Sequence, residues 1–275
     1  MLAQRVNTQA GVTVDELMEL AEELAREGNV AAALNLLLQQ VVPALDASDA
    51  SHEAAVAIAR LADVVEAQGH YEAALGLWRE QVLPRSMGVS ELHIEALNRV
   101  AELHVTCEEY DEAIRLRCEV ILPLCHTLDD PSIGATNLAF LAETLFKAGR
   151  LDESLKCWTE NVLPAFVELG DDATCALACG KIADIHQANG DHHEALRIRL
   201  HEQIPTYEAL GDLESLVVAR TNLDINLIAR DAEGDRDNAR IILEAALADA
   251  EEEALPPAPD IRAFMIKRGF LAAEE

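Results

Sequence analysis

Basic and aromatic residues are scarce in this sequence of 275 residues. Lys and Arg together number 21 against 50 Asp and Glu, which gives a formal net charge of −29, and Phe, Trp and Tyr make up only 4%. A field of that sign repels nucleic acid and anionic membrane surfaces, so we expect neither as a partner, and it favours a basic partner. The same charge also serves solubility, so the charge alone does not identify a partner.

Long apolar runs are missing as well. No stretch of 18 consecutive apolar residues occurs, so we expect no membrane span. The opening residues MLAQRVNTQAG lack the apolar core of a secretory signal, so we expect a cytoplasmic location. In that compartment the six cysteines are expected to stay reduced: Cys107, Cys118, Cys125, Cys157, Cys175 and Cys179.

Signatures of catalysis are the third absence. The sequence has no phosphate-binding glycine loop, no HExxH motif and no nucleophile elbow. Cys175, Cys179 and His186 fall on one helical face, but a zinc site needs four converging ligands, and small cysteines packed between helices explain the pattern better. We therefore expect no catalytic residue, no cofactor and no metal, with a metal-dependent enzyme built on this cluster as the less favoured alternative.

What the sequence does contain is a repeat. The stretch GHYEAALGLWREQVLP, Gly69–Pro84, returns in three clear copies and one fainter copy, each closed by a proline at a nearly constant interval. Those prolines are Pro43, Pro84, Pro123, Pro164 and Pro205. A small residue recurs with the same spacing in the first apolar run of each copy: Ala21, Ala62, Ala101, Ala142 and Ala183. With apolar residues at helical spacing, a fixed period of roughly 40 residues predicts an all-α fold, an α-solenoid of about six antiparallel helical hairpins.

Further positions agree in phase and point to a family. A glycine ends the first helix seven residues after the alanine in four copies, Glu108 replaces it in the third, and the second helix opens with YDEAI or LDESL. Over roughly residues 13–210 this pattern resembles the tetratricopeptide repeat. The family implies a right-handed superhelix whose concave groove binds peptides or partner proteins. The period here is longer than the family's usual one, and similar to the extended repeats of kinesin light chains and of bacterial signalling arrays.

The prolines and tryptophans fit within this scheme. Proline removes a helical hydrogen bond, so we interpret the second helix of each hairpin as kinked there and continuing for one or two turns. Trp78 and Trp158 occupy equivalent places, which Arg117 and Arg199 take in other copies. We interpret the tryptophans as packing between repeats.

The predicted boundaries follow from the repeat. We expect an N-terminal arm over residues 1–12 and a solenoid over 13–254, opened by a capping box from Thr13 to Glu16. The expected repeats lie near 13–52, 53–91, 92–131, 132–172 and 173–212, with a capping hairpin of shifted phase over 213–254. A proline-rich break and an amphipathic tail form residues 255–275.

An acidic residue follows each repeat alanine directly. In the tetratricopeptide unit this position lines the groove, so we predict a partner groove that also includes the cations and the amide a few residues earlier. Its residues are Glu22, Asp63, Glu102, Glu143, Asp184, Arg60, Asn98, Arg99 and Lys181. The alternative is pairing along each helix, Arg60 with Asp63, Arg99 with Glu102 and Lys181 with Asp184, worth a few tenths of a kcal/mol each.

The tail carries apolar residues and cations together. The residues concerned are Ile261, Arg262, Phe264, Met265, Lys267 and Arg268. This composition leaves two interpretations open, in which the tail either binds an acidic groove or caps the open end of the last hairpin.

The function expected from these features is that of a non-enzymatic scaffold or adaptor, which binds a partner peptide or domain in an acidic concave groove. The alternative is a regulatory subunit or sensor array that controls a separate enzyme, such as a caspase-like peptidase or a signalling NTPase.

Overall fold

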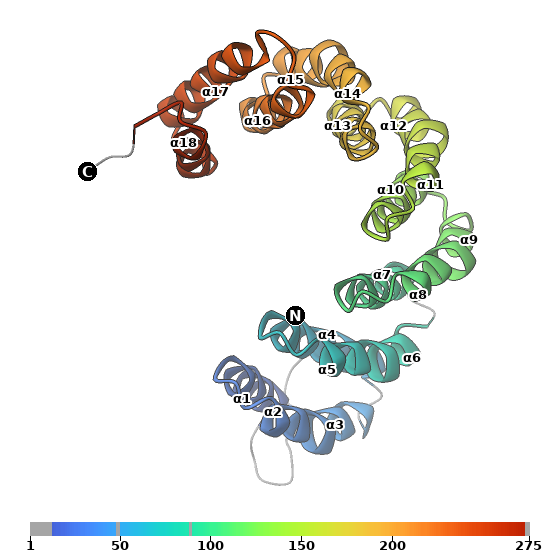
Figure 1. Ribbon diagram of the computed structural model, residues 1–275. Coiled ribbons are helices and arrows are strands. Elements are labelled where there is room, and N and C mark those ends of the chain that lie inside the picture. Colours follow the sequence, from blue (N-terminus) through green and yellow to red (C-terminus); the bar gives the residue numbers. More distant parts are fainter. Residues whose placement is uncertain (1–12, 48–49, 88–89, 273–275) are drawn as a thin grey trace. The chain divides into compact units, whose positions relative to one another are not determined.

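The computed structural model describes residues 13–47, 50–87 and 90–272, and helices are the only regular elements among them. The chain divides into two compact units, Met1–Asp129 and Asp130–Glu275, which are described separately (Figure 1). The predicted N-terminal arm lies outside the described residues.

Unit 1 consists of three helical hairpins. Their first helices are α1 (Val14–Arg26), α4 (Ser51–Ala67) and α7 (Ser90–Thr106). Each second helix runs through an α segment, a five-residue π-turn and another α segment. These are α2 (Val30–Leu36), η1 (Leu37–Val41) and α3 (Val42–Ala47); α5 (Tyr71–Leu77), η2 (Trp78–Val82) and α6 (Leu83–Ser86); α8 (Tyr110–Leu116), η3 (Arg117–Ile121) and α9 (Leu122–Cys125).

Unit 2 repeats this plan twice and then changes it. Its first helices are α10 (Pro131–Lys147), α13 (Asp172–Ala188) and α16 (Leu213–Arg230). The second helices are α11 (Leu151–Cys157), η4 (Trp158–Val162) and α12 (Leu163–Leu169); α14 (His192–Ile198), η5 (Arg199–Gln203) and α15 (Ile204–Leu210); and the uninterrupted α17 (Asp235–Glu252). A final short helix, α18 (Ala258–Lys267), packs against α17.

The π-turns explain how the second helices pass their prolines. Pro84 has no N–H to donate, and just before it the N–H of Leu83 bonds to the carbonyl of Trp78, five residues back instead of four. The same bond closes the other four π-turns. The helix therefore continues beyond every repeat proline, as expected, through a π-turn that the sequence pattern did not reveal.

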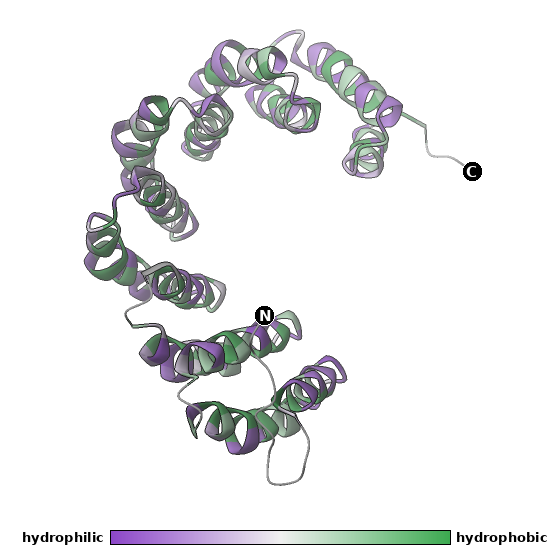
Figure 2. Cartoon of the chain, turned by 180° about the vertical axis from the view of Figure 1, so that it is seen from behind, coloured by the Kyte–Doolittle hydropathy of each residue, from purple (hydrophilic) through white to green (hydrophobic). Residues whose placement is uncertain are grey.

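The repeat alanines form the close contacts between paired helices. All five are fully buried, and in the fourth hairpin the hydroxyl of Ser154 donates to the carbonyl of Ala142 at 2.7 Å. Each helix carries both hydrophobic and hydrophilic residues, as Figure 2 shows, so one side of it joins the core of its unit.

The turns and caps follow the sequence closely. Gly69 adopts φ 80°, and Glu108, which replaces the glycine in the third hairpin, adopts φ 62°. Both are left-handed ends of first helices. The capping box is confirmed, because the Glu16 N–H donates to the Thr13 hydroxyl and the Thr13 N–H donates to the Glu16 carboxylate.

The first residue of each π-turn is buried in every repeat. Its exposed fraction is 3% or less at all five positions: Leu37, Trp78, Arg117, Trp158 and Arg199. The prediction that the two tryptophans pack between repeats agrees with their burial and with the contacts of their π-turns, since η2 lies against α7 and η4 against α13, the first helices of the next hairpins. The two arginines share this buried place.

The last hairpin keeps the repeat register longer than expected. Asp212 caps α16 as Asp171 caps α13 in the hairpin before it. At the other end of these helices, Gly190 and Asp231 both adopt a left-handed conformation. They are separated by the same number of residues as the caps Asp171 and Asp212. The prediction of a phase shift over the whole hairpin is therefore wrong for α16. The shift begins in the turn, because α17 starts at Asp235, four residues after Asp231, whereas α14 starts two residues after Gly190.

One segment, Val30–Ala47, is long and apolar enough to cross a membrane among the described residues. It is the second helix of the first hairpin. A third of the segment is buried, and its buried residues, among them Leu37, Val41 and Leu45, belong to the hydrophobic core of unit 1.

Candidate functional site

In unit 1 two of the acidic positions after the repeat alanines, Glu22 and Asp63, contact a cation of the next first helix. Glu22, which is largely buried, lies 2.7 Å from Arg60 and 2.8 Å from Arg26. Asp63 lies 2.6 Å from Arg99. These pairs thus join neighbouring hairpins. The alternative prediction, in which Arg60 pairs with Asp63 along one helix, is wrong, because Arg60 pairs with Glu22.

Arg99 is the centre of a small charged cluster. It lies 2.8 Å from Glu66 and 3.3 Å from Glu102, and its guanidinium stands 5.8 Å from the centre of the Trp78 ring. The predicted pairing of Arg99 with Glu102 along α7 is therefore present, as one contact among several.

Asn98 faces the interior of the third hairpin. Its side-chain oxygen accepts a hydrogen bond of 3.0 Å from buried Arg117. Burial lowers the pKa of Arg117 to about 10, against the opposing attraction of Glu102. Asn98 therefore has a structural partner already, whatever else it contacts.

In unit 2 the two remaining acids are also paired. Glu143 lies 3.0 Å from Lys181 of the next first helix, and Asp184 pairs with Arg199 of its own hairpin. All five acidic positions of the predicted groove thus contact a cation within their unit. A basic partner would have to compete with these contacts, and its binding there remains a prediction.

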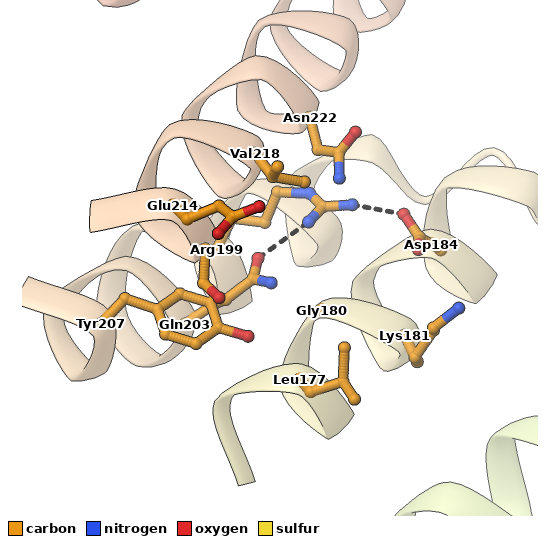
Figure 3. Close-up of a pocket in the computed structure, with 11 residues that line it drawn as sticks. Leu177, Gly180, Lys181, Asp184, Arg199, Gln203, Tyr207, Glu214, Val218 and Asn222 are labelled. Carbon is orange, nitrogen blue, oxygen red and sulfur yellow. Dashed lines mark hydrogen bonds and ion pairs between the residues drawn. The ribbon is translucent and has the colours of Figure 1, made fainter. Parts of the chain in front are cut away.

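A pocket of about 350 Å³ opens in unit 2 between α13 and α16, above η5 and α15 (Figure 3). The first helices supply its walls and the second helix of the fifth hairpin supplies its floor. Two of the predicted groove residues, Lys181 and Asp184, line it.

Arg199 is buried in the pocket floor and forms hydrogen bonds with three neighbouring side chains. It is 1% exposed, and it donates to Asn226 at 2.6 Å, to Gln203 at 2.8 Å and to Asp184. Burial lowers the pKa of the arginine and raises the pKa of Asp184, and in each case the partner's charge opposes the shift. The floor is therefore an ordered hydrogen-bonded network that presents a fixed surface.

Gly180 leaves the space in which one member of this network lies. A β-carbon at that position would lie 2.2 Å from the side-chain nitrogen of Gln203. The absence of a side chain therefore lets the Gln203 amide lie directly against α13.

Two exposed apolar side chains flank the pocket. Leu177 on α13 is 47% exposed and Val218 on α16 is 45% exposed, and the two stand at equivalent positions of successive first helices. One turn further along the same helices come Lys181 and Asn222 (Figure 3). The arrangement offers apolar contact with polar groups beside it, which is typical of sites that bind a polypeptide segment.

The tail covers the end of the last hairpin. Ile261 and Met265 of α18 are 2% and 0% exposed and pack with Val217 of α16 and Leu243 of α17. This packing favours the interpretation in which the tail caps the open end of the last hairpin.

Two arginines of the tail form ion pairs with acidic residues of the last hairpin. Arg262 pairs with Glu251, and Arg268 lies 3.1 Å from Asp224 and 4.3 Å from the Phe264 ring centre. Lys267 is exposed.

The cysteine cluster has the properties of packing residues. Among the described residues no three His, Cys, Asp or Glu side chains are placed to hold a metal ion together. Burial is the main cause that raises the pKa of the Cys179 thiol to about 12, and nearby Glu202 adds to it. A thiol with so high a pKa is a poor nucleophile.

Comparison with protein families finds no match, and comparison with curated proteins finds none either. Solved structures do match. A putative kinesin light chain of Podosopora anserina with nearly identical tetratricopeptide-like repeats is 22% identical, with a TM-score of 0.53 over 72% of this chain and 96% of that one. BtubC (BKLC) from P. vanneervenii is 18% identical, with a TM-score of 0.61 over 96% of both chains.

A third match is a signal transduction ATPase with numerous domains from Pyrococcus horikoshii, which carries a tetratricopeptide repeat sensor. It is 14% identical, with a TM-score of 0.61 over 92% of this chain and 37% of that one. These similarities establish the fold. The chain is an all-α solenoid of tetratricopeptide type, as the repeat pattern predicted.

Sequence reasoning missed most of the pocket. Gln203 breaks a recurring pattern, because the residue two before the repeat proline is apolar in the other copies: Val41, Val82, Ile121 and Val162. This departure did not enter the prediction. Leu177 and Val218 look like ordinary apolar positions of a helix. A second local signal was Gly180, a glycine inside a helical run, which often marks a close approach of another group.

Proposed function

We propose that this chain is a non-enzymatic interaction scaffold, and that the pocket of unit 2 receives a segment of a partner protein. The observation that carries the proposal is the pair Leu177 and Val218, both about half exposed, on either side of a pocket with an ordered polar floor. Exposed apolar groups at the rim of a pre-formed pocket favour binding, because little ordering is required when the partner arrives.

The bound segment would be extended and lie across α13 and α16. An apolar side chain of the segment would contact Leu177 and Val218, while Asn222 can both donate to and accept from its backbone. The net charge of −29 favours a basic segment, and Glu214 at the pocket adds an acidic group on the α16 side.

The chemistry of the pocket supports binding over catalysis. Its most buried charged groups, Arg199 and Asp184, are committed to each other and to the neighbouring amides. A catalytic acid, base or nucleophile would have to remain available to a substrate.

A regulatory role is the second candidate. The Pyrococcus horikoshii protein joins a similar array, described as a sensor, to an ATPase. In that role the pocket would receive a segment of a separate enzyme in the cytoplasm, and binding would change that enzyme's activity.

The proposal is tested by affinity capture from the native cell. The double variant Leu177→Asp with Val218→Asp should lose proteins that the wild-type chain retains, because two carboxylates would face an apolar contact. Ile241→Asp is the matched control, since Ile241 is 57% exposed on α17 and does not line the pocket. Equal retention by all three chains would contradict the proposed site.

Assay of the captured protein separates the two roles. A partner enzyme whose activity changes on adding the wild-type chain, and not the double variant, would favour regulation. Unchanged activity would favour a scaffold.

A further inference from the structure

The buried arginine of the unit 2 pocket fixes the direction of the hydrogen bonds around it. Arg199 carries only N–H groups, so the Gln203 side chain turns its oxygen towards the arginine, at 2.8 Å. The nitrogen of the same amide faces away from Arg199 and is the atom nearest to a β-carbon placed at position 180. Gln203 is therefore left with N–H groups to donate on its other side.

Tyr207 takes the next place along the pocket floor. It lies one turn after Gln203, lines the pocket and is only 5% exposed. Burial is the main cause that raises the pKa of its phenol, while hydrogen bonds with Gln203 and Ser215 oppose the shift. A hydrogen bond that favours the ionised phenol is one donated to its oxygen. Gln203 and Ser215 therefore both donate to Tyr207.

The Tyr207 hydroxyl is left with its own hydrogen to donate. The phenol oxygen has two lone pairs, and the two neighbouring donors occupy them, so it cannot also accept from a cation. Figure 3 shows the hydroxyl on the side of the ring that faces α13, and the pocket of about 350 Å³ has room for a side chain. A largely buried O–H group without an acceptor is unfavourable, so Tyr207 favours a ligand that offers one.

Glu214 supplies the opposite kind of group. It precedes Ser215 on α16, lines the same pocket and is exposed. A carboxylate can only accept hydrogen bonds, and it repels a second carboxylate. A ligand group that fits Tyr207 and Glu214 together therefore carries both an acceptor and a donor, and no negative charge.

We propose that this end of the pocket holds a primary carboxamide, the side chain of a glutamine or asparagine in the partner segment. Its carbonyl oxygen accepts from the Tyr207 hydroxyl, and its NH₂ group donates to the Glu214 carboxylate. An ammonium or guanidinium group would satisfy Glu214 alone, and a carboxylate would satisfy Tyr207 alone. This inference rests on the function proposed above and adds the chemistry of a second side chain of the bound segment.

The spacing of the pocket residues relates this side chain to the apolar one. Glu214 lies four residues before Val218 on α16, which is about 6 Å along the helix axis. Side chains two residues apart in an extended segment point the same way at a separation of about 7 Å. The carboxamide therefore stands two residues from the apolar side chain that contacts Leu177 and Val218.

Capped pentapeptides test this preference in the full-length chain. Each has a central leucine, alanines elsewhere, and glutamine, asparagine, glutamate or lysine two positions before or after the leucine, so that both directions of binding are covered. Shifts of backbone amide signals in NMR titrations give the dissociation constants. The best amide peptide should bind about 5-fold more tightly than the glutamate and lysine peptides, the effect of one hydrogen bond of about 1 kcal/mol.

Two variants separate the two contacts. Tyr207→Phe should abolish the preference for the amide over lysine, because no O–H remains to be satisfied. Glu214→Gln should abolish the preference for the amide over glutamate, because the repulsion is gone. Tyr71→Phe is the matched control and should change neither, since Tyr71 is 40% exposed in unit 1 and does not line the pocket.

The comparison of peptides on the unaltered chain stands even where a variant fails to fold. A preference for the amide that Tyr207→Phe removes supports the inference. Equal binding of all peptides overturns it but leaves the proposed function intact, because the leucine is still bound. A preference for lysine or glutamate, or an amide preference that Tyr207→Phe leaves unchanged, also overturns it. Binding of no peptide overturns it too, and the capture of the native partner then decides the proposed function separately.

Discussion

At the scale of single residues, the first residue of the π-turn shows that one buried position of the repeat can hold either an aromatic or a charged side chain. The first residue of each π-turn is buried, and it is tryptophan in the second and fourth hairpins and arginine in the third and fifth. The arginines are tolerated because polar neighbours meet them, Asn98 beside Arg117 and an acid with two amides beside Arg199. The network around Arg199 in turn shapes the candidate pocket.

Gly180→Ala tests that network. The new methyl group would force the end of the Gln203 side chain to shift and weaken its bond to Arg199. We expect the loss of that bond, about 1 kcal/mol, to cancel the gain in free energy of unfolding that alanine otherwise brings to a helix. Gly134→Ala in α10 is the control, because a β-carbon there meets no atom within 4 Å, and it should gain up to about 1 kcal/mol. Urea unfolding of both variants measures the difference, and a gain at both positions would contradict the close approach at Gly180.

Asp224 makes stability depend on pH. Burial raises its pKa to about 6, although Arg268 opposes the shift. Because this folded pKa lies above the unfolded one, the folded state binds the proton more tightly. The contribution of this group to stability is therefore greatest below pH 4 and is lost as pH rises from about 4 to 6.

Replacing the buried pair tests this. The double variant Asp224→Ala with Arg268→Met restores the repeat residue, and we expect it to be more stable than the wild type by about 1–4 kcal/mol at pH 7. That advantage should shrink as pH falls through 6 toward 4. Arg268→Met alone should lose about 3–5 kcal/mol at pH 7, because the carboxylate then lacks its cation. Denaturant melts at pH 7 and pH 5 would contradict this account if the double variant's advantage grew on acidification.

At the scale of elements, the sequence predicted the parts that depend on steric repetition. The fully buried alanines and the left-handed helix ends recur because every hairpin must bring two helices close and then turn. The π-turns could not be read from the same pattern, since a proline is compatible with a kink or with a widened turn, and packing on both sides decides between them. The predicted phase of α16 was wrong, because an aspartate was not expected in place of the repeat alanine. Asp224 nevertheless follows Ala183 at the same interval at which Ala183 follows Ala142.

Overpacking tests the helix register. Ala142→Leu would insert a large side chain where the Ser154 hydroxyl reaches the Ala142 carbonyl at 2.7 Å, so we expect a loss of about 1–3 kcal/mol. Ala272→Leu, on an exposed position after α18, should change the free energy of unfolding very little. Equal midpoints of thermal unfolding for the two variants would contradict the assigned helix register.

At the scale of the whole molecule, strong negative charge and local neutralisation coexist. The predicted groove acids each meet a cation inside their unit, so the net charge of −29 comes largely from acids elsewhere on the surface. Sequence reasoning placed the acids correctly along the helices. It found the pairing of Arg99 with Glu102 but not the cations that meet the other four acids, since contacts between different helices depend on how the helices pack and not on spacing within one helix.

Whether the unit 2 pocket holds a partner polypeptide is the central question. Photo-cross-linking in the native cell addresses it most directly, with a benzophenone amino acid placed at position 177, 218 or 241 in turn. We predict that one partner polypeptide cross-links at 177 and at 218 and is absent at 241. No polypeptide product at 177 or 218, or the same products at all three positions, would contradict the account.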